Sequence, residues 1–348
     1  MRLLLLGGTE FAGRAVAEAA LGRGWEVTVF HRGHHEPPAG VRSLHGDRTA
    51  PDGLAALAGA EGAWDAVVDT WSAAPYAVRD AARLLRDRVR RYVYVSSISV
   101  YTWPRPAGYA EDVPVVDGAS ADAGQSDYAR DKRGGELAAV EAFGADRSVL
   151  VRSGLILGPY ENVGRLPWWL GRIARGGPVL APGPRDLPLQ YVDVRDLAEW
   201  VLGAVERESS GPYNLIGPQG HATMGTLLDA CVRATGNAAE LRWTDPEVIL
   251  EAGIEPWVQL PVWVPPGSDM HDALHSADVS RALATGLECR PVADTVTDTW
   301  RWLQDGRNRP LRPDRTGHGL DPEVEAKVLA ASGGASAGGG AGRGGGAS

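Results

Sequence analysis

Tyr128 and Lys132 are the two side chains whose types and spacing are best suited to acid–base chemistry. In the stretch Tyr128-Ala129-Arg130-Asp131-Lys132 the phenol and the ammonium would share one face of a helix. A free tyrosine has a pKa of about 10, so alone it is a poor acid–base catalyst at neutral pH. A neighbouring ammonium favours the phenolate, and such a tyrosine can give or take a proton. Because this spacing also arises by chance in many helices, it needs support from elsewhere.

A serine-rich segment supplies that support. Ser96-Ser97-Ile98-Ser99 follows the apolar run 92–95, which has the length of a buried strand. Hydroxyls at this point would emerge at the carboxyl end of a strand, where doubly wound sheets bind ligands. A serine there can donate a hydrogen bond to a carbonyl and stabilise the alkoxide that forms from it. The alternative is that the serines only cap the strand end.

The elements that must position these side chains alternate along the first 160 residues. Short apolar runs at 3–6, 27–30, 67–69, 92–95 and 149–152 are typical of buried parallel strands. Between them, 11–23 and 76–90 carry apolar residues at helical spacing, and a helix starts near Tyr128. The alternation predicts an α/β fold with a doubly wound parallel sheet of the Rossmann type.

The later part of the chain has a different composition, rich in proline and tryptophan. A strand-like run at 189–194 leads into a further helix, so we expect a smaller C-terminal substrate lobe interleaved with the first domain. The expected division is a dinucleotide-binding domain at 1–160, completed by about 188–216, and a substrate lobe at 161–187 and 217–317. The Gly/Ala/Ser tail 332–348 is too poor in apolar side chains to fold, and we expect it to be disordered.

A glycine-rich turn joins the first strand to the first helix. In Gly7-Gly8-Thr9-Glu10-Phe11-Ala12-Gly13 the glycines allow a tight turn and close approach of the backbone to a pyrophosphate, whose charge the helix N-terminus stabilises. A glycine turn by itself is a weak signal, but its place after the first strand favours a dinucleotide site. The cofactor contacts predicted here are Gly7, Thr9, Glu10, Phe11 and Gly13.

The second strand ends at His31-Arg32, where an NAD-preferring site usually has a carboxylate for the ribose 2′-hydroxyl. A 2′-phosphate would instead find a cation, which favours NADP, with NAD as the alternative. Glu10 opposes this preference because it adds negative charge to the phosphate-binding turn. Asp47 is predicted to bond the adenine amino group, unless it is an ordinary turn aspartate. Asp69, at the end of its strand, and Lys132 complete the predicted cofactor contacts.

Composition narrows the classes of partner. The net charge of −9 disfavours nucleic acid, because such binding depends on neutralising phosphates. Cys231 and Cys289 are isolated thiols without metal-type spacing, which indicates a reducing compartment. The leucine run at the start is too short for a secretory core or a membrane span, so we expect a cytoplasmic protein without a membrane partner. His271 and His275 lack an identifiable third ligand, and no metal site is predicted.

These stretches together resemble the extended short-chain dehydrogenase/reductase family, which includes sugar-nucleotide epimerases and dehydratases. The resemblance spans about residues 1–305 and includes the glycine turn, Asp47, the serine motif ending in Val100-Tyr101, the Tyr-Lys pair, Arg152 to Gly158-Pro159, and 190–198. It implies Ser97, Tyr128 and Lys132 as the catalytic set. It also implies a possible homodimer through helices near 76–90 and 128–143.

Departures from the family pattern narrow the chemistry that the resemblance implies. Glu10 stands at the family's middle glycine, as in an atypical Gly-Gly-Thr branch. Ile98 and Ser99 replace the acidic pair of family dehydratases, which argues against dehydration. Leu155 and Leu189 stand where nucleotide-sugar members have an Asn and an Arg. The substrate contacts predicted are Ser99, Leu155, Trp168 and Trp169, of which the tryptophans could instead be core.

The sequence therefore predicts an NAD(P)H-dependent oxidoreductase that reduces a carbonyl or oxidises an alcohol of a small, partly apolar molecule. An epimerase would use the same residues for transient oxidation and reduction from the other face. A non-catalytic nucleotide sensor or an RNA-binding relative is the third hypothesis. Retention of Ser97, Tyr128 and Lys132 argues against the sensor, and the negative charge argues against RNA.

Overall fold

The computed structural model describes residues 1–236, 238–305 and 319–337, with only the backbone described from 332 onward. Its centre is a seven-stranded parallel sheet in the order β11-β6-β5-β4-β1-β2-β3. The strands are β1 (Arg2–Leu6), β2 (Glu26–His31), β3 (Arg42–His45), β4 (Trp64–Asp69), β5 (Val89–Ser97), β6 (Ser148–Ser153) and β11 (Gly211–Leu215). The predicted doubly wound α/β fold is thus confirmed.

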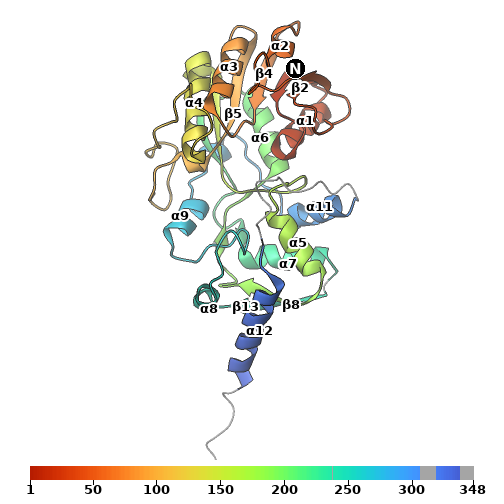
Figure 1. The fold of residues 1–348 in the computed structure, drawn as a ribbon, viewed down its shortest axis with the longest axis vertical. Coiled ribbons are helices and arrows are strands. Elements are labelled where there is room, and N and C mark those ends of the chain that lie inside the picture. The colour runs from red at the N-terminus through yellow and green to blue at the C-terminus, as the bar shows by residue number, and fades with distance from the viewer. Residues whose placement is uncertain (237, 306–318, 338–348) are drawn as a thin grey trace, which may run out of the picture.

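Helices cover both faces of the sheet because its strands are apolar on both sides (Figure 1). Alternate residues of β1 show this directly: Leu3 and Leu5 pack toward α1 (Phe11–Gly22) and α6 (Val194–Glu206). Leu4 and Leu6 belong to the core on the other face, under α3 (Pro75–Leu85) and α4 (Tyr128–Phe143). All four leucines are essentially without solvent exposure. Near-continuous apolar strands of this kind are the mark of a parallel sheet buried on both faces.

A second lobe lies below the sheet domain in Figure 1 and has its own apolar core. Its strands β8 (Gly177–Pro182) and β13 (Ala239–Thr244) pair in parallel. The helices are α5 (Arg165–Ala174), α7 (Met224–Ala234), α8 (Pro246–Glu251), α9 (Asp269–His275), α11 (Val292–Gln304) and α12 (Pro322–Ala337). The intervening α10 (Ser280–Ala284) packs on the sheet domain, where Ala282 belongs to the core and accepts a hydrogen bond from Trp200. The chain enters this lobe after β6, returns for α6 and β11, and leaves again, so the two parts are interleaved. The predicted domain boundaries themselves remain a prediction, and 306–317 lie outside the described residues.

Short elements complete the chain and join its two parts. They are α2 (Ala55–Ala58), the 3₁₀ turns Ile98–Val100 and Ala145–Arg147, β7 (Ile156–Leu157), β9 (Pro188–Leu189), β10 (Val192–Asp193) and β12 (Ala222–Thr223). The predicted strand at 189–194 is therefore broken into β9 and β10. The predicted helix at 76–90 is too long, since Val89 is already buried as the first residue of β5.

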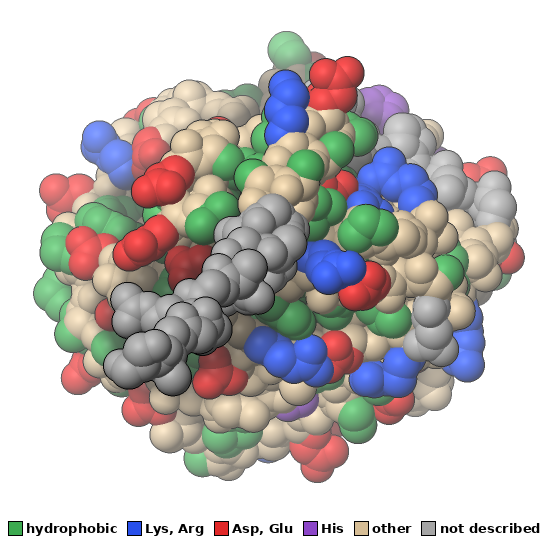
Figure 2. Space-filling model, turned by 90° about the horizontal axis from the view of Figure 1, so that it is seen from below, with side chains coloured by type: hydrophobic (Ala, Val, Ile, Leu, Met, Phe, Trp, Pro, Cys, Tyr) green, Lys and Arg blue, Asp and Glu red, His purple; other side chains and the backbone are tan. Residues whose placement is uncertain are grey.

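The tail departs from its prediction in one part. Residues 332–337, expected to be disordered, are helical and continue α12, while 338–348 lie outside the described residues. The helix is anchored near its start, where Arg172 pairs with Glu325 at 2.6 Å and the Leu180 amide donates to the same carboxylate at 3.1 Å. Figure 2 shows the face below the lobe, where basic and acidic side chains are interspersed. The first turn of α12 is therefore held against α5 and β8.

Candidate functional site

The glycine turn after β1 has the backbone geometry of a close-approach site. Gly7 and Gly8 have φ of 114° and 94°, in the region that favours glycine. Gly13, in the first turn of α1, packs so closely that a Cβ there would lie 2.6 Å from the Gly8 nitrogen. Glu10 at the N-cap of α1 makes no side-chain cap hydrogen bond. The turn thus combines glycine-only conformations with a helix N-terminus that has no side-chain cap, as a pyrophosphate requires.

The Glu10 carboxylate is turned toward neighbouring loops. It accepts a hydrogen bond from Asn162 Nδ2 at 3.0 Å, and His35 Nε2 lies 3.3 Å from the same oxygen. Asn162 belongs to the loop between β7 and α5, where Tyr160 also donates to Glu18 at 3.2 Å. These contacts tie that loop to the glycine turn. They also give the extra negative charge at the turn two partners that the sequence did not reveal.

The ends of β2 and β3 carry the predicted adenosine contacts. His31 is buried, and its Nδ1 accepts a hydrogen bond from the Gly33 amide at 3.2 Å, whereas its Nε2 has no partner in the structure. Burial and the neighbouring His45 lower the pKa of His31 below its usual value. Arg32 is exposed. Asp47 holds a local turn through the Thr49 amide and hydroxyl, at 2.9 and 2.6 Å, and these hydrogen bonds lower the pKa of its carboxyl.

Lys132 is the most tightly fixed of the predicted catalytic residues. It is 3% exposed, and its Nζ donates to the carbonyls of Trp71 at 2.7 Å and Val95 at 2.6 Å. The ammonium also lies 5.0 Å from the centre of the Tyr94 ring, within range of a cation–π interaction. Its position is therefore set from two strands, by the segment after β4 and by the last residues of β5.

The identity of this residue is itself informative. The chain contains 35 lysine and arginine residues, yet Lys132 and Lys327 are the only lysines. A compact ammonium can fit between two carbonyls where a planar guanidinium cannot. A chain that otherwise uses arginine for its cations keeps lysine at the point where the smaller head group is needed.

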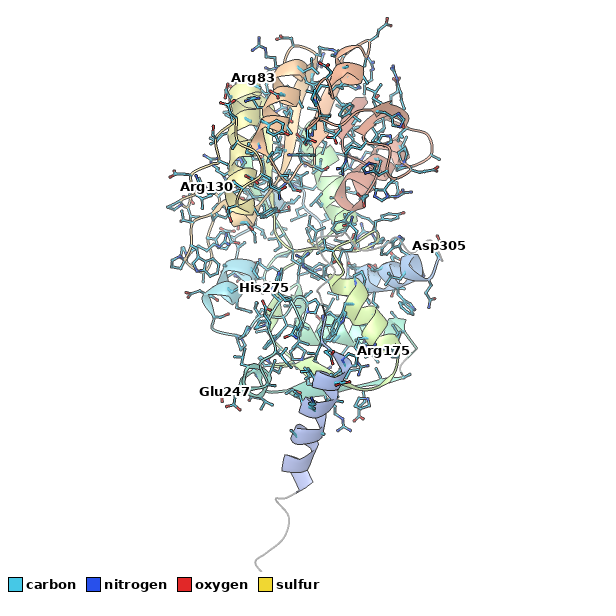
Figure 3. All side chains as sticks on the ribbon, in the orientation of Figure 1. Arg83, Arg130, Arg175, Glu247, His275 and Asp305 are labelled. Atoms are coloured by element: carbon cyan, nitrogen blue, oxygen red, sulfur yellow. The ribbon has the colours of Figure 1, made fainter. Side chains whose placement is uncertain are left out.

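Tyr128 and Ser97 lie on the elements that Lys132 joins. Tyr128 opens α4, next to the N-cap Asp127, whose carboxylate accepts from the amides of residues 129 and 130. Its side chain is among the exposed large aromatic groups, with 47% of the residue exposed. Ser97 ends β5. Its hydroxyl donates to the Ser99 hydroxyl at 3.1 Å and accepts from the Ser99 amide at 3.1 Å. In Figure 3 Arg130, in the first turn of α4, lies toward the lower lobe, and Arg83 of α3 lies at the far end.

Asp69 does not present its carboxylate to a ligand. It is fully buried and forms an ion pair with Arg48, accepts from Tyr92 at 2.5 Å, and accepts from the Trp71 amide at 2.9 Å. Its predicted role as a direct cofactor contact therefore lacks geometric support. Arg48 and Trp71, which no sequence pattern singled out, hold this position. The only signal for Arg48 was its place directly after Asp47.

The predicted substrate contacts fall into different surroundings. Ser99 lies beside Ser97, as expected from the sequence. Leu155 is buried in the core of the lower lobe. Trp169 is also core, with no exposure and its indole donating to the Pro261 carbonyl at 2.7 Å, which argues against a substrate contact. Trp168 stacks edge-on to Trp169 at 4.7 Å and packs against Gly319, so only this tryptophan of the pair is partly exposed.

Two shallow hollows lie elsewhere on the surface. One of about 580 Å³ is at the amino ends of the strands, lined by Arg2, Trp64, Arg86, Arg88 and Arg90 among others. The other, of about 470 Å³, is lined by Tyr160, Arg301, Trp302, Gln304 and Asp305. Neither includes Ser97, Tyr128 or Lys132. In the described part of the chain no cluster of three or more His, Cys, Asp or Glu side chains could hold a metal ion. Among the same residues no helix is long and apolar enough to span a membrane.

Solved structures share this architecture across almost their whole length. The Bordetella bronchiseptica enzyme WbmH in complex with NAD⁺ superposes with a TM-score of 0.60 at 18% identity, covering 88% of this chain and 98% of that one. The UDP-N-acetylglucosamine 4-epimerase of Bacillus cereus gives 0.62 at 16% identity, covering 87% and 99%. At such identities the likeness establishes the fold.

Two curated proteins are similar in sequence. The 2′-dehydrokanamycin reductase of Streptomyces kanamyceticus is 33% identical over 190 residues, which is 52% of this chain and 51% of that protein. The chloroplast stem-loop binding protein of 41 kDa b of Arabidopsis thaliana is 24% identical over 267 residues, 71% and 65% of the two chains. The matches thus span about half to two-thirds of these relatives.

The family profile covers the part of the chain that contains the glycine turn, the serine motif and the Tyr-Lys pair. It matches residues 3–217, from β1 to the end of β11. These residues include all but the first residue of the parallel sheet, together with helices α1 and α4. The chain is a member of the NAD-dependent epimerase/dehydratase family.

Proposed function

We propose that this protein is an NADP(H)-dependent carbonyl reductase, or alcohol dehydrogenase in the reverse direction, with Ser97, Tyr128 and Lys132 as its catalytic residues. The observation that carries the proposal is the placement of Lys132. A buried ammonium is held by two carbonyls at the carboxyl edge of the sheet, one turn after an accessible tyrosine. A cation is costly to bury, so such a site favours a functional role.

The residues at this edge fit a dinucleotide. The turn at Gly7–Gly13 and the start of α1 would hold the pyrophosphate. His31, whose buried Nε2 has no partner in the structure, and exposed Arg32 would receive the adenosine ribose and its 2′-phosphate, with Asp47 near the adenine. The absence of an acid at this strand end supports NADP over NAD. When bound, this cofactor supplies or accepts the hydride.

The chain's own residues handle the carbonyl oxygen and the proton. The Ser97 hydroxyl, on the rigid end of β5, donates to the substrate oxygen and orients it. The Tyr128 hydroxyl gives its proton to that oxygen as the carbonyl carbon gains hydride. One negative and one positive charge are added, so the product is a neutral alcohol. The Lys132 ammonium stabilises the phenolate that remains. In the oxidising direction the same proton returns to Tyr128.

Reduction is favoured over epimerisation by two observations. Leu155 and Leu189 are buried and apolar at positions where nucleotide-sugar members of the family contact a diphosphate. The similarity to a protein named 2′-dehydrokanamycin reductase also supports a ketone substrate. An epimerase remains the second candidate, since the fold is shared with several epimerases. The proposed partner is a small, partly apolar molecule.

Two further proposals concern assembly and nucleic acid. A homodimer would use α3 and α4, and Leu137 on α4 is 46% exposed, as an interface residue would be in an isolated chain. The similarity to a stem-loop binding protein supports a nucleic-acid-binding alternative, which the net charge of −9 opposes. A gel-shift assay with an RNA stem-loop at low salt tests that alternative.

The deciding experiment starts with calorimetry of NADPH and NADH on the purified protein. Tight binding with preference for NADPH is expected, followed by consumption of NADPH with members of a ketone and aldehyde panel that includes 2′-dehydrokanamycin. Interconversion of sugar epimers with retained nucleotide and no net consumption would favour the epimerase. Failure to bind either nucleotide would overturn the proposal as a whole.

A further inference from the structure

The segment just after β4 connects a buried ion pair to Lys132. We propose that Arg48 and Asp69 are positioning residues, which fix the backbone at Trp71 and through it the place of the Lys132 ammonium. The inference rests on the proposed role of Lys132, and it assigns a task to two residues that have no direct access to substrate.

The first step is the ion pair itself. Two Arg48 nitrogens face the two carboxylate oxygens of Asp69, one at 2.9 Å and the other in a shorter contact. The side chains are 5% and 0% exposed. Tyr92, also fully buried, donates to the same carboxylate. A planar guanidinium in two-pronged contact with a carboxylate has a fixed orientation, so this pair is a rigid reference point inside the domain.

The second step runs from the ion pair to the amide and the ring of Trp71. The Asp69 carboxylate accepts the Trp71 amide at 2.9 Å, and the Arg48 guanidinium lies 4.8 Å from the centre of the Trp71 ring. The indole nitrogen donates to the Ala74 carbonyl at 3.0 Å. The amide and the side chain of Trp71 are thus both held against the pair, which restricts the direction of the Trp71 carbonyl in the next peptide unit.

The third step is the carbonyl. Trp71 O accepts from Lys132 Nζ at 2.7 Å and from the Tyr94 hydroxyl at 3.0 Å. Tyr94 is the ring over which the ammonium lies. Two of the contacts described for Lys132, the Trp71 carbonyl and the Tyr94 ring, therefore depend on one peptide. Moving that peptide would move the ammonium relative to Tyr128, and small misplacements of catalytic groups are expensive in rate.

The scarcity of lysine allows a direct measurement. In protein labelled with ¹³C- and ¹⁵N-lysine only Lys132 and Lys327 give side-chain signals, and Lys327 in α12 serves as an internal reference. A buried ammonium held by carbonyls and an aromatic ring should have Cε and Nζ resonances well separated from those of an exposed lysine. Its separation from the Lys327 signals reports the environment of Lys132 without any assay of turnover.

Two variants break the ion pair in different ways. Asp69→Asn keeps the shape of the side chain but removes the charge, and Arg48→Met removes the guanidinium. In both we expect the Lys132 signals to move toward those of Lys327, and kcat to fall by roughly 10- to 100-fold with little change in KM for the carbonyl substrate. Arg88→Met is the matched control, because Arg88 lies over Trp64 at the opposite end of β4 and should leave Lys132 unchanged.

The outcomes separate this inference from the proposed function. Unchanged Lys132 signals in folded Asp69→Asn or Arg48→Met protein would overturn the positioning role, whatever the activity. If Arg48→Met does not fold, Asp69→Asn decides, since it conserves volume. If instead Lys132→Ala and Tyr128→Phe retain full turnover, the proposed function fails even though the signals shift.

Discussion

A tryptophan lies under an arginine at the start of β4 and again just beyond its end, and the two pairs have different surroundings. At the amino edge of the sheet Arg88 lies 5.2 Å from the centre of the Trp64 ring, and at the carboxyl edge Arg48 lies 4.8 Å from that of Trp71. Arg88 lines an open hollow and donates to backbone carbonyls, including those of Leu57 and Ala58. Arg48 is buried and paired with a buried carboxylate.

The difference shows that the same combination of residue types, an arginine over a tryptophan, can serve two purposes. At the amino edge Arg88 lines an open hollow that water can enter, and there the arginine covers a tryptophan and holds a loop through its carbonyls. At the carboxyl edge a lost partner would leave a charge in the interior, where it is costly. Of these two pairs, the one with a buried ion pair lies at the edge where Lys132 is held, which fits the chemistry that we propose.

The largest expected contrast between the edges is in turnover. Tyr128→Phe removes one hydroxyl from a half-exposed side chain and should lower kcat by roughly 10²- to 10⁴-fold, because proton transfer is lost. The unfolding midpoint in urea should stay near that of the wild type. Arg88→Met, at the other edge, should leave kcat within about twofold. Equal turnover in the two variants would remove the catalytic distinction between the edges.

Stability should separate the two arginines. Arg48→Met strands the Asp69 carboxylate in the interior and should lower the free energy of unfolding by about 3–5 kcal/mol. Arg88→Met loses one partly solvated cation–π contact and hydrogen bonds that water can replace, at a cost of about 1 kcal/mol. Urea titrations of both variants give the two values. Losses of similar size would mean that burial at the carboxyl edge has been overestimated.

Lys132→Arg sharpens the comparison by keeping the charge and changing its shape. A guanidinium cannot occupy the place between the Trp71 and Val95 carbonyls over the Tyr94 ring without displacing them, so we expect roughly a 100-fold loss of kcat. Steady-state kinetics with saturating NADPH checks this. Wild-type turnover in the variant would show that charge alone is required there.

The smallest effect concerns cofactor affinity. Glu10→Gln removes a negative charge from the glycine turn while keeping an acceptor for Asn162, and should tighten NADPH binding by about two- to fivefold. Glu26→Gln, on an exposed residue at the amino end of β2, is the control and should leave the affinity unchanged. Calorimetry measures both. Weaker binding in Glu10→Gln would indicate that the carboxylate organises the turn more than it repels phosphate.

The fold was accessible from the sequence because its signals are local. Apolar runs such as Leu3–Leu6, a glycine turn after the first of them, and helical spacing between runs all arise within a few residues. The strand at 189–194 and the helix at 76–90 were misjudged at their ends, where tertiary contacts decide. The placement of Trp169 shows the same limit, since periodicity cannot distinguish a tryptophan in a core from one in a pocket.

The sequence by itself determined the parallel sheet, the turn at Gly7–Gly13, and the set Ser97, Tyr128 and Lys132 as candidates, because each rests on residue type and short spacing. Only the tertiary structure decided what surrounds them. Arg48 and Asp69 are 21 positions apart, and Lys132 is 61 positions from the carbonyl that holds it. No local pattern encodes contacts of that kind, since they form only when parallel strands bring their carboxyl ends to one edge.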